Sequence, residues 1–214
     1  MKKLFVSALF ALLGTGAFAQ TAPGTVVVSG QVGFGVSSTD GENTGNFPNT
    51  TEFSIGPSIG YLLSDGLELG LNLRYSHSKY SYDREGNNLS VDYVNNGFRF
   101  SPYLKKYFMV SDKVAFTGSA FAGYEISNSK RGSDSVFMTD SETKSNTFDI
   151  GVAPGIVFFP TEKIGISGSL GRLSYSTIKA KSSEGEVSNE RTTNNFGFDF
   201  SSSLYLGFSY YISR

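Results

Sequence analysis

Cysteine and tryptophan are absent from the 214-residue sequence, and histidine occurs once. Without cysteine the chain forms neither disulfides nor thiolate metal sites, so its fold depends on backbone pairing and packing alone. No segment contains eighteen consecutive apolar residues, which excludes a transmembrane helix. The near balance of 18 basic and 19 acidic residues gives no basic surplus that would indicate nucleic-acid binding.

The abundant residues are instead phenylalanine, tyrosine and glycine, at 19, 12 and 25 copies. Aromatic residues favour strands, and glycine permits twisted strands with close backbone approaches. This composition is therefore typical of a β protein and does not suit a helical domain.

The first 19 residues have a different pattern from the rest. Lys2 and Lys3 precede an apolar core at Leu4–Leu13, and a small-x-small site follows at Ala17–Ala19. This pattern predicts a cleaved secretory signal peptide over residues 1–19, too short to be a spanning helix, followed by a single domain over residues 20–214.

The predicted domain repeats one hairpin pattern three times. The repeats lie at Glu52–Ser76, Phe98–Ser127 and Phe148–Ser176. Each has a proline midway along its first arm, a polar turn with an acid, and a second arm rich in glycine and apolar residues. One further strand at each end, near Thr25–Ser37 and Asn195–Ile212, completes an eight-stranded antiparallel sheet.

Irregularities are expected at the prolines of the first arms and at one glycine. A strand proline removes a donor from the ladder, so we expect bulges at Pro57, Pro102 and Pro154. The apolar positions of the seventh strand change parity between Leu170 and Leu173, and a bulge near Gly171 would restore them to one face.

The two faces of the predicted strands differ in side-chain size as well as polarity. One face is almost purely Phe, Leu, Ile, Val and Tyr, whereas the other combines Gly and Ser with scattered charges. The convex wall of a small barrel has room for large side chains and its interior favours small ones, so the apolar face should contact lipid. Lipid cannot satisfy an open sheet edge, so the sheet must close. The sequence predicts an all-β, eight-stranded, up-and-down transmembrane β-barrel; a soluble β protein would need the opposite orientation.

Connection lengths and aromatic positions fit this interpretation. Three short turns alternate with four polar stretches, near 38–50, 79–96, 128–146 and 177–193, which we interpret as extracellular loops. Without tryptophan, the interfacial girdle should come from aromatic residues near strand ends. These are Tyr61, Tyr75, Tyr107, Phe108, Phe159, Tyr175, Tyr210 and Tyr211.

Charged residues on the inward face form the candidate site. They are Glu52, Glu68, Arg74, Arg99, Lys105, Glu125, Asp149 and Asp199. Eight strands leave an interior just wide enough for side chains, and buried charges need partners, which favours a packed network of opposite charges. A charged pore lining is the alternative.

Two other stretches contain residue types found in catalytic or metal sites. His77 lies between Ser76 and Ser78, but strand neighbours point to opposite faces, so an interfacial histidine is favoured over a catalytic one. The stretch Asp83–Asn88 lacks the spacing of a calcium loop, and it is interpreted as a solvated loop, as are Asp134, Asp140 and Glu142. No cofactor or metal is expected.

Two segments, Ser101–Lys113 and Ala153–Ser176, resemble the repeated hairpins of outer-membrane β-barrel-domain proteins. These are small, porin-like, eight-stranded barrels related in shape to OmpX and the OmpA membrane domain. The resemblance extends over about Thr25–Arg214 and implies export through the periplasm to the outer membrane of a diderm (Gram-negative) bacterium. Such barrels usually end on an aromatic residue that the assembly machinery reads. Here Ile212–Arg214 follow Tyr211, so Phe208 or Tyr210 would take that role.

The expected function is that of a non-enzymatic integral outer-membrane protein of the cell envelope. The barrel would be a scaffold for four extracellular loops with a surface-interaction or envelope-structural role. The expected partners are outer-membrane lipid, the barrel-assembly machinery through the C-terminal strand and an extracellular ligand through the loops, with no nucleic acid. A narrow porin-like channel for small solutes and a lipid-modifying outer-membrane enzyme are the alternatives.

Overall fold

The computed structural model describes residues 21–37, 47–84, 89–133, 141–184, 187–200 and 206–213. The predicted signal peptide lies outside the described residues. The strands are β1 (Val26–Ser37), β2 (Phe47–Ser64), β3 (Leu67–Arg84), β4 (Leu89–Ser111), β5 (Val114–Ser133), β6 (Ser141–Thr161), β7 (Ile164–Ser169), β8 (Gly171–Glu184), β9 (Val187–Phe200) and β10 (Leu206–Ile212). The described residues contain no helix long and apolar enough to cross a membrane.

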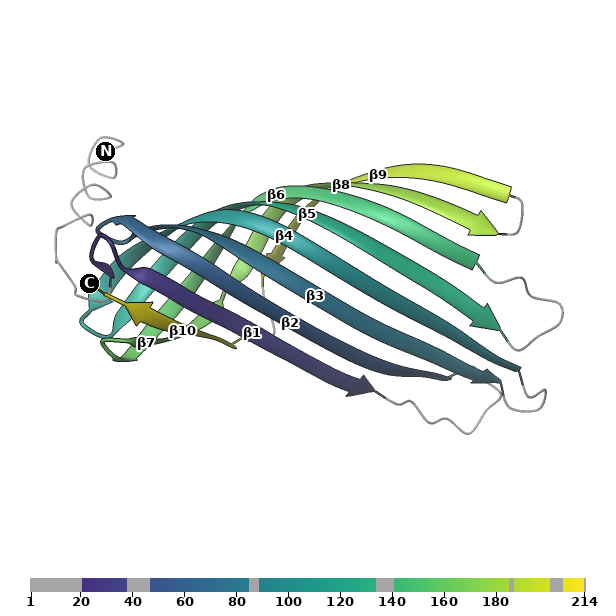
Figure 1. Ribbon diagram of the computed structural model, residues 1–214, viewed down its shortest axis with the longest axis horizontal. Coiled ribbons are helices and arrows are strands. Elements are labelled where there is room, and N and C mark those ends of the chain that lie inside the picture. Colours follow the sequence, from purple (N-terminus) through teal and green to yellow (C-terminus); the bar gives the residue numbers. More distant parts are fainter. Residues whose placement is uncertain are drawn as a thin grey trace.

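The strands form a closed antiparallel barrel, as the sequence predicts (Figure 1). A ring of eight strands, β1 to β7 and β10, is closed by the β5–β6, β7–β10 and β1–β10 pairings. β8 continues the line of β7 and pairs with β6, and β9 adds to β8. The short turns at Asp65–Gly66, Asp112–Lys113 and Glu162–Lys163 lie at the end where β1 begins and β10 ends.

The seventh predicted strand contains the predicted bulge. Ile156 of β6 pairs with Gly168, whereas Val152 pairs with Leu173, so one extra residue is accommodated between β7 and β8. The amide of Leu170 donates to the carbonyl of Pro154 across this irregularity, at 3.0 Å. The extra residue returns Leu173 to the outer face, and the bulge at Gly171 and Pro154 is confirmed.

The expectation of bulges at Pro57 and Pro102 is wrong. The ladder is interrupted beside each proline, but the register is the same before and after the interruption. A proline removes one donor without adding a residue, so the pairing resumes unshifted. The Ser101 hydroxyl donates to the carbonyl of Ala122, opposite Pro102, at 3.0 Å and so satisfies that acceptor.

Three of the four polar stretches expected as long loops, 79–96, 128–146 and 177–193, are mostly strand, and most of the fourth, 38–50, lies outside the described residues. β3 and β4 extend to Arg84 and from Leu89, and β8 and β9 are separated only by residues 185–186. Ladder hydrogen bonds use backbone atoms, so pairing continues after the side chains become polar. The barrel wall therefore extends well beyond its apolar part.

The eighth predicted strand does not keep one register with the seventh, because Phe200 pairs with Gly171 whereas Leu206, six residues later, pairs with Gly168. It divides into β9 and β10, and its predicted residues Leu204 and Tyr205 lie outside the described part of the chain. Along the described residues, β1 pairs with β10 only over Val26–Gly30, and β9 pairs with β8 alone. Outer side chains beside these edges are therefore unusually exposed, with Phe34 at 75% and Phe198 at 70%.

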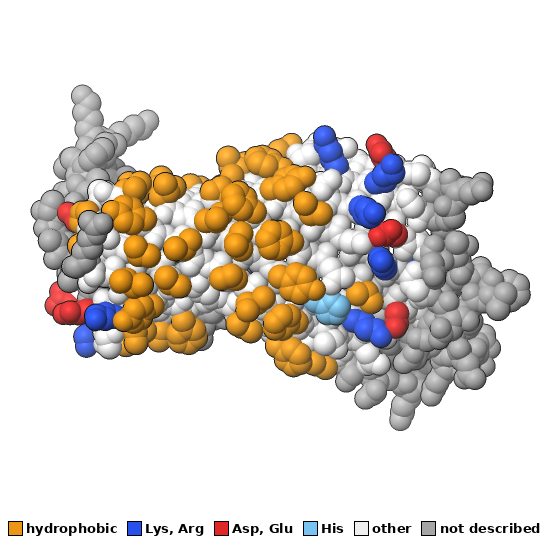
Figure 2. Space-filling model, in the orientation of Figure 1, with side chains coloured by type: hydrophobic (Ala, Val, Ile, Leu, Met, Phe, Trp, Pro, Cys, Tyr) orange, Lys and Arg blue, Asp and Glu red, His pale blue; other side chains and the backbone are white. Residues whose placement is uncertain are grey.

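The orientation of the two faces is as predicted. Large apolar side chains cover the outside in a broad band (Figure 2), whereas Glu68 and Asp149 are buried inside at 0% and 1% exposure. The expectation that Tyr107, Phe159 and Tyr211 belong to the interfacial girdle is wrong, because all three occupy inward positions and are buried. They belong to a buried apolar cluster at the short-turn end, which we call the plug: Val27, Leu62, Tyr107, Ala115, Val157, Phe159 and Tyr211.

Candidate functional site

A chain of alternating charges crosses the barrel interior from β3 to β8. Asp149 of β6 bonds Arg99 of β4 at 2.7 Å and Arg172 of β8 at 2.5 Å. Glu125 of β5 lies 3.4 Å from Arg74 of β3 and 4.0 Å from Arg99. Each carboxylate is thus shared by two guanidinium groups, an arrangement that offsets the desolvation of the buried charges.

Gly123 makes the space for the most buried pair. It lies opposite Asp149 in the β5–β6 register, and a Cβ there would lie 2.0 Å from Arg99 Nη2 and 2.4 Å from Asp149 Oδ1. Any larger side chain would collide with the ion pair. Arg172 also lies over the ring of Phe121, 4.8 Å from its centroid, which fixes the guanidinium from the other side.

A second cluster surrounds Glu68 closer to the short turns. The carboxylate accepts hydrogen bonds from the hydroxyls of Tyr103 and Tyr107, and the ammonium of Lys105 lies 3.6 Å away. The hydroxyls of Tyr107 and Tyr211 are 3.1 Å apart, which links the cluster to the plug. Lys105 lies over both the Tyr103 and Tyr107 rings, 5.0 and 5.6 Å from their centroids.

The plug fills the interior beside the Glu68 cluster. Phe159 and Tyr211 meet edge to face at 5.4 Å between ring centroids, and Tyr107 lies 6.5 Å from Phe159. These three rings are at most 4% exposed. Together, the two charged clusters and the plug occupy the interior from the middle of the barrel to its short-turn end.

The predicted charged residues divide into these two clusters and two outliers. Arg74, Arg99, Glu125 and Asp149 form the first cluster, and Glu68 and Lys105 belong to the second. Glu52 instead accepts a hydrogen bond from the Tyr80 hydroxyl at 3.0 Å, and it is exposed. Asp199 is exposed on β9, opposite Arg172 in register.

The sequence matches the model of a protein family described as the outer membrane protein beta-barrel domain, over residues 5–211. The chain belongs to this family. It is an integral β-barrel protein of the outer membrane, and the predicted location is confirmed.

Solved structures of similar fold are distant in sequence. Neisserial surface protein A is 16% identical, with coverage of 87% of this chain and 96% of that one and a TM-score of 0.37. A major outer membrane protein from Thermus thermophilus is 13% identical, with coverage of 88% and 98% and a TM-score of 0.49. The ferric yersiniabactin uptake receptor FyuA from Yersinia pestis is 14% identical over 76% of this chain, with a TM-score of 0.40, and the chain spans only 26% of its length. No curated protein matches.

Several residues of the interior clusters were missed at the sequence level. The bulge at Gly171 places the Arg172 side chain on the inward face. The change of parity at Gly171 could therefore have identified Arg172 as an interior residue. Tyr103 was placed on the inward face but not singled out, and Tyr107 and Tyr211 were assigned to the girdle although alternation gives both an inward position, because tyrosine is equally suited to the lipid interface and to a buried hydrogen bond.

The other candidate motifs of this outer-membrane barrel are placed as follows. His77 faces outward, and its Nδ1 lies 2.8 Å from Asn96 Oδ1, which also accepts a bond from the Tyr75 hydroxyl. Ser78 occupies the opposite face and accepts from Asn95 at 3.3 Å. Glu142 accepts a hydrogen bond from Asn128 at 2.8 Å. The side chains of 83–88, and residues Asp134 and Asp140, lie outside the described residues. Across the described ranges, no three metal-ligating side chains gather.

Proposed function

We propose that this outer-membrane protein is a non-enzymatic, non-conducting scaffold that presents its outer strand ends and loops for surface interaction or envelope support. The observation that carries the proposal is the occupied interior. Asp149 is held between two arginines, Glu68 is held by two tyrosines and a lysine, and aromatic rings close the short-turn end.

The energetics of these contacts support a static interior. A buried ion pair that loses one partner costs about 3–5 kcal/mol, so neither cluster opens readily to admit a solute. The Glu68 carboxylate is fully buried and satisfied by neighbours from the same barrel, so no water-filled path is needed to stabilise it. Because the interior is occupied, we expect binding at the outer end of the barrel, where loops are held by the strands.

Single-channel recording in planar bilayers tests the proposal. The wild-type protein should show no steady conductance, whereas a Tyr107→Ala, Phe159→Ala double variant, which removes two rings of the plug, should show open events. The silent wild type and the conducting variant together would support a sealed interior. Steady conductance of the wild type would overturn the proposal in favour of a narrow channel.

The absence of enzymatic activity is part of the proposal and has its own test. His77 shares its hydrogen-bond partner with Tyr75 and faces away from Ser78, which is a poor arrangement for a nucleophile and base. Cells that carry His77→Ala should therefore have the same outer-membrane lipid composition as the wild type by mass spectrometry. A changed lipid profile would indicate a lipid-modifying enzyme instead.

A further inference from the structure

The outward side chains above the apolar band are arranged in layers. Counted along each strand, the last outward residue of the apolar band on β3, β4, β5, β6, β8 and β9 is Tyr75, Phe98, Ile126, Phe148, Tyr175 and Phe196. The next outward positions are His77, Asn96, Asn128, Asn146, Thr177 and Asn194, all polar and without an acid. The layer after that is Lys79, Val94, Lys130, Lys144, Lys179 and Thr192. Four strands therefore place a lysine at the same step, and we call these four residues the lysine layer.

Counted along each strand, acidic residues come one outward step after the lysine position. Asp92, Glu142 and Glu190 occupy the next outward positions on β4, β6 and β9. Figure 2 shows the charged side chains gathered just beyond the hydrophobic band on the side away from the short turns. Lys79 is paired with Asp92 at 2.7 Å and Lys130 lies directly opposite Glu142, whereas Lys179 has the neutral residues Asn146 and Thr192 opposite it. Lysines about 13 Å along each strand from the last apolar residue lie at a height that suits lipid phosphates.

Basic residues are densest where β6 meets β8, because Lys181, one outward step after Lys179 on β8, joins Lys144 and Lys179 of the lysine layer. Lys144 and Lys181 are directly opposite in register on the outer face, and Lys179 is diagonal to Lys144. Like charges directly opposite on a sheet repel and destabilise the pairing. Their acidic neighbours are only loosely engaged, with Glu142 at 3.9 Å from Lys144 and Glu190 at 3.7 Å from Lys181. An external anion would relieve this repulsion.

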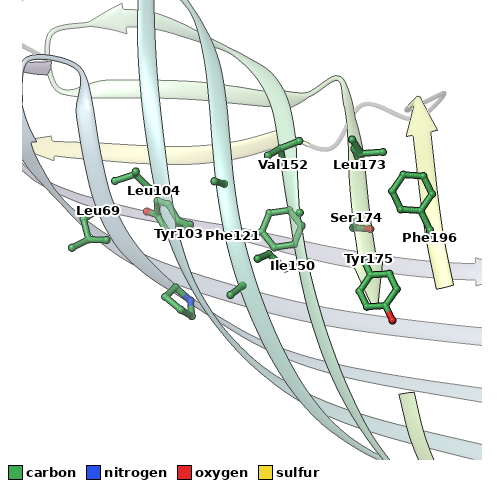
Figure 3. Close-up of a pocket in the computed structure, with 14 residues that line it drawn as sticks. Leu69, Tyr103, Leu104, Phe121, Ile150, Val152, Leu173, Ser174, Tyr175 and Phe196 are labelled. Carbon is green, nitrogen blue, oxygen red and sulfur yellow. The ribbon is translucent and has the colours of Figure 1, made fainter. Parts of the chain in front are cut away.

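An apolar groove lies below this cluster on the same side of the barrel (Figure 3). Its volume is about 560 Å³, within the range of ligand-binding clefts. The small side chains of Ala120 and Ala122 leave it open, and larger residues such as Ile150, Val152 and Tyr175 flank it. Tyr175 is four residues below Lys179 on β8, or about 13 Å, so an acyl chain in this groove reaches the lysines within one leaflet.

We propose that Lys144, Lys179 and Lys181 bind the phosphate of a membrane lipid whose acyl chain lies in the groove over Ala120 and Ala122. The occupant is a phosphorylated lipid of the leaflet on the long-connection side. The three lysines face outward and take no part in the interior ion pairs, whereas the groove is also lined by Tyr103 and Phe121, which contact Glu68 and Arg172 on the inner side of the wall.

Native mass spectrometry of the detergent-purified protein with phosphatidic acid tests the lysines. A Lys144→Gln, Lys181→Gln variant should bind about 25-fold more weakly, at roughly fivefold per lysine. The matched control is Lys113→Gln, Lys163→Gln, which makes the same charge change at exposed turn positions and should bind within twofold of the wild type. Lys144→Arg, Lys181→Arg should keep the affinity and rule out misfolding as the cause. Equal binding by the glutamine variant and its control would overturn the proposal.

The source of the anion and the role of the groove are tested separately. Diacylglycerol with the same chains should not bind, and millimolar inorganic phosphate should displace phosphatidic acid only weakly. Full displacement by inorganic phosphate would mean a free-anion site and would refute the lipid. Ala122→Phe should weaken phosphatidic acid about tenfold by filling the groove, whereas Ile59→Phe on the apolar face of β2 should not. Unchanged binding by Ala122→Phe would refute the acyl-chain position.

Discussion

Replacing Asp149 by asparagine removes the negative charge that Arg99 and Arg172 share. The Asp149 side chain is 1% exposed and that of Arg99 10%, so their pair is buried, and loss of one partner from such a pair costs about 3–5 kcal/mol. Arg172 is 40% exposed, so the loss of its contact adds at most about 1 kcal/mol. We therefore expect Asp149→Asn to lower the free energy of unfolding by about 3–5 kcal/mol.

The assay is urea unfolding of the vesicle-inserted protein, followed by the gel mobility of unboiled samples because the chain has no tryptophan for fluorescence. Asp199→Asn is the matched control, since Asp199 is exposed and its loss should change stability by no more than about 0.5 kcal/mol. An Asp149→Leu, Arg99→Met double variant should recover part of the loss by replacing the pair with apolar groups. Equal stability of Asp149→Asn and Asp199→Asn would refute the ion-pair interpretation.

Three further predictions concern the glycine contact, the outer ion pair and the closed barrel. Gly123→Ala should destabilise the barrel by about 1–3 kcal/mol through overpacking, whereas Gly197→Ala, where a Cβ meets nothing within 4 Å, should be close to neutral in the same urea assay. Hydrogen bonds from Lys79 and, to a smaller extent, from Ser81 lower the pKa of Asp92 below its usual 3.8. The small contribution of Asp92 to stability is therefore present above pH 3.8 and is lost as the pH falls through the lowered pKa of the folded protein. NMR titration should show this lowered pKa, and Lys79→Gln should raise it; an unchanged pKa in Lys79→Gln would contradict the assignment. Boiled and unboiled samples should migrate differently in detergent gels, and equal mobility would count against a closed barrel.

The outer face was predictable because it depends only on a period of two. Phe34, Phe98 and Phe198 were assigned to lipid by alternation, and the structure exposes all three. The bulge at Gly171 was also predictable, because an inserted residue changes the parity of every apolar position after it.

The strand ends and the proline geometry were not predictable in the same way. Backbone pairing does not depend on side-chain polarity, so Lys79 and Lys130 continue strands that had been interpreted as loops. Bulges require an unequal residue count on two partner strands, and Pro57 alone says nothing about its partner β3. Only the charged members of the Glu68 cluster were predicted as site residues. Its tyrosines were not, because tyrosine is equally suited to the lipid interface and to a buried hydrogen bond.

If the long-connection end faces outward, as the proposed function requires, the polar strand ends determine what an approaching molecule meets. Because β3, β4, β8 and β9 keep their ladder pairing up to Arg84, Leu89, Glu184 and Val187, much of the described outer end is a paired, twisted wall. Neighbouring side chains on that wall come from positions far apart in the sequence, as with Lys130 and Glu142. Antibodies raised against the folded protein should therefore recognise shapes that boiling destroys, and short synthetic peptides from the same stretches should compete poorly.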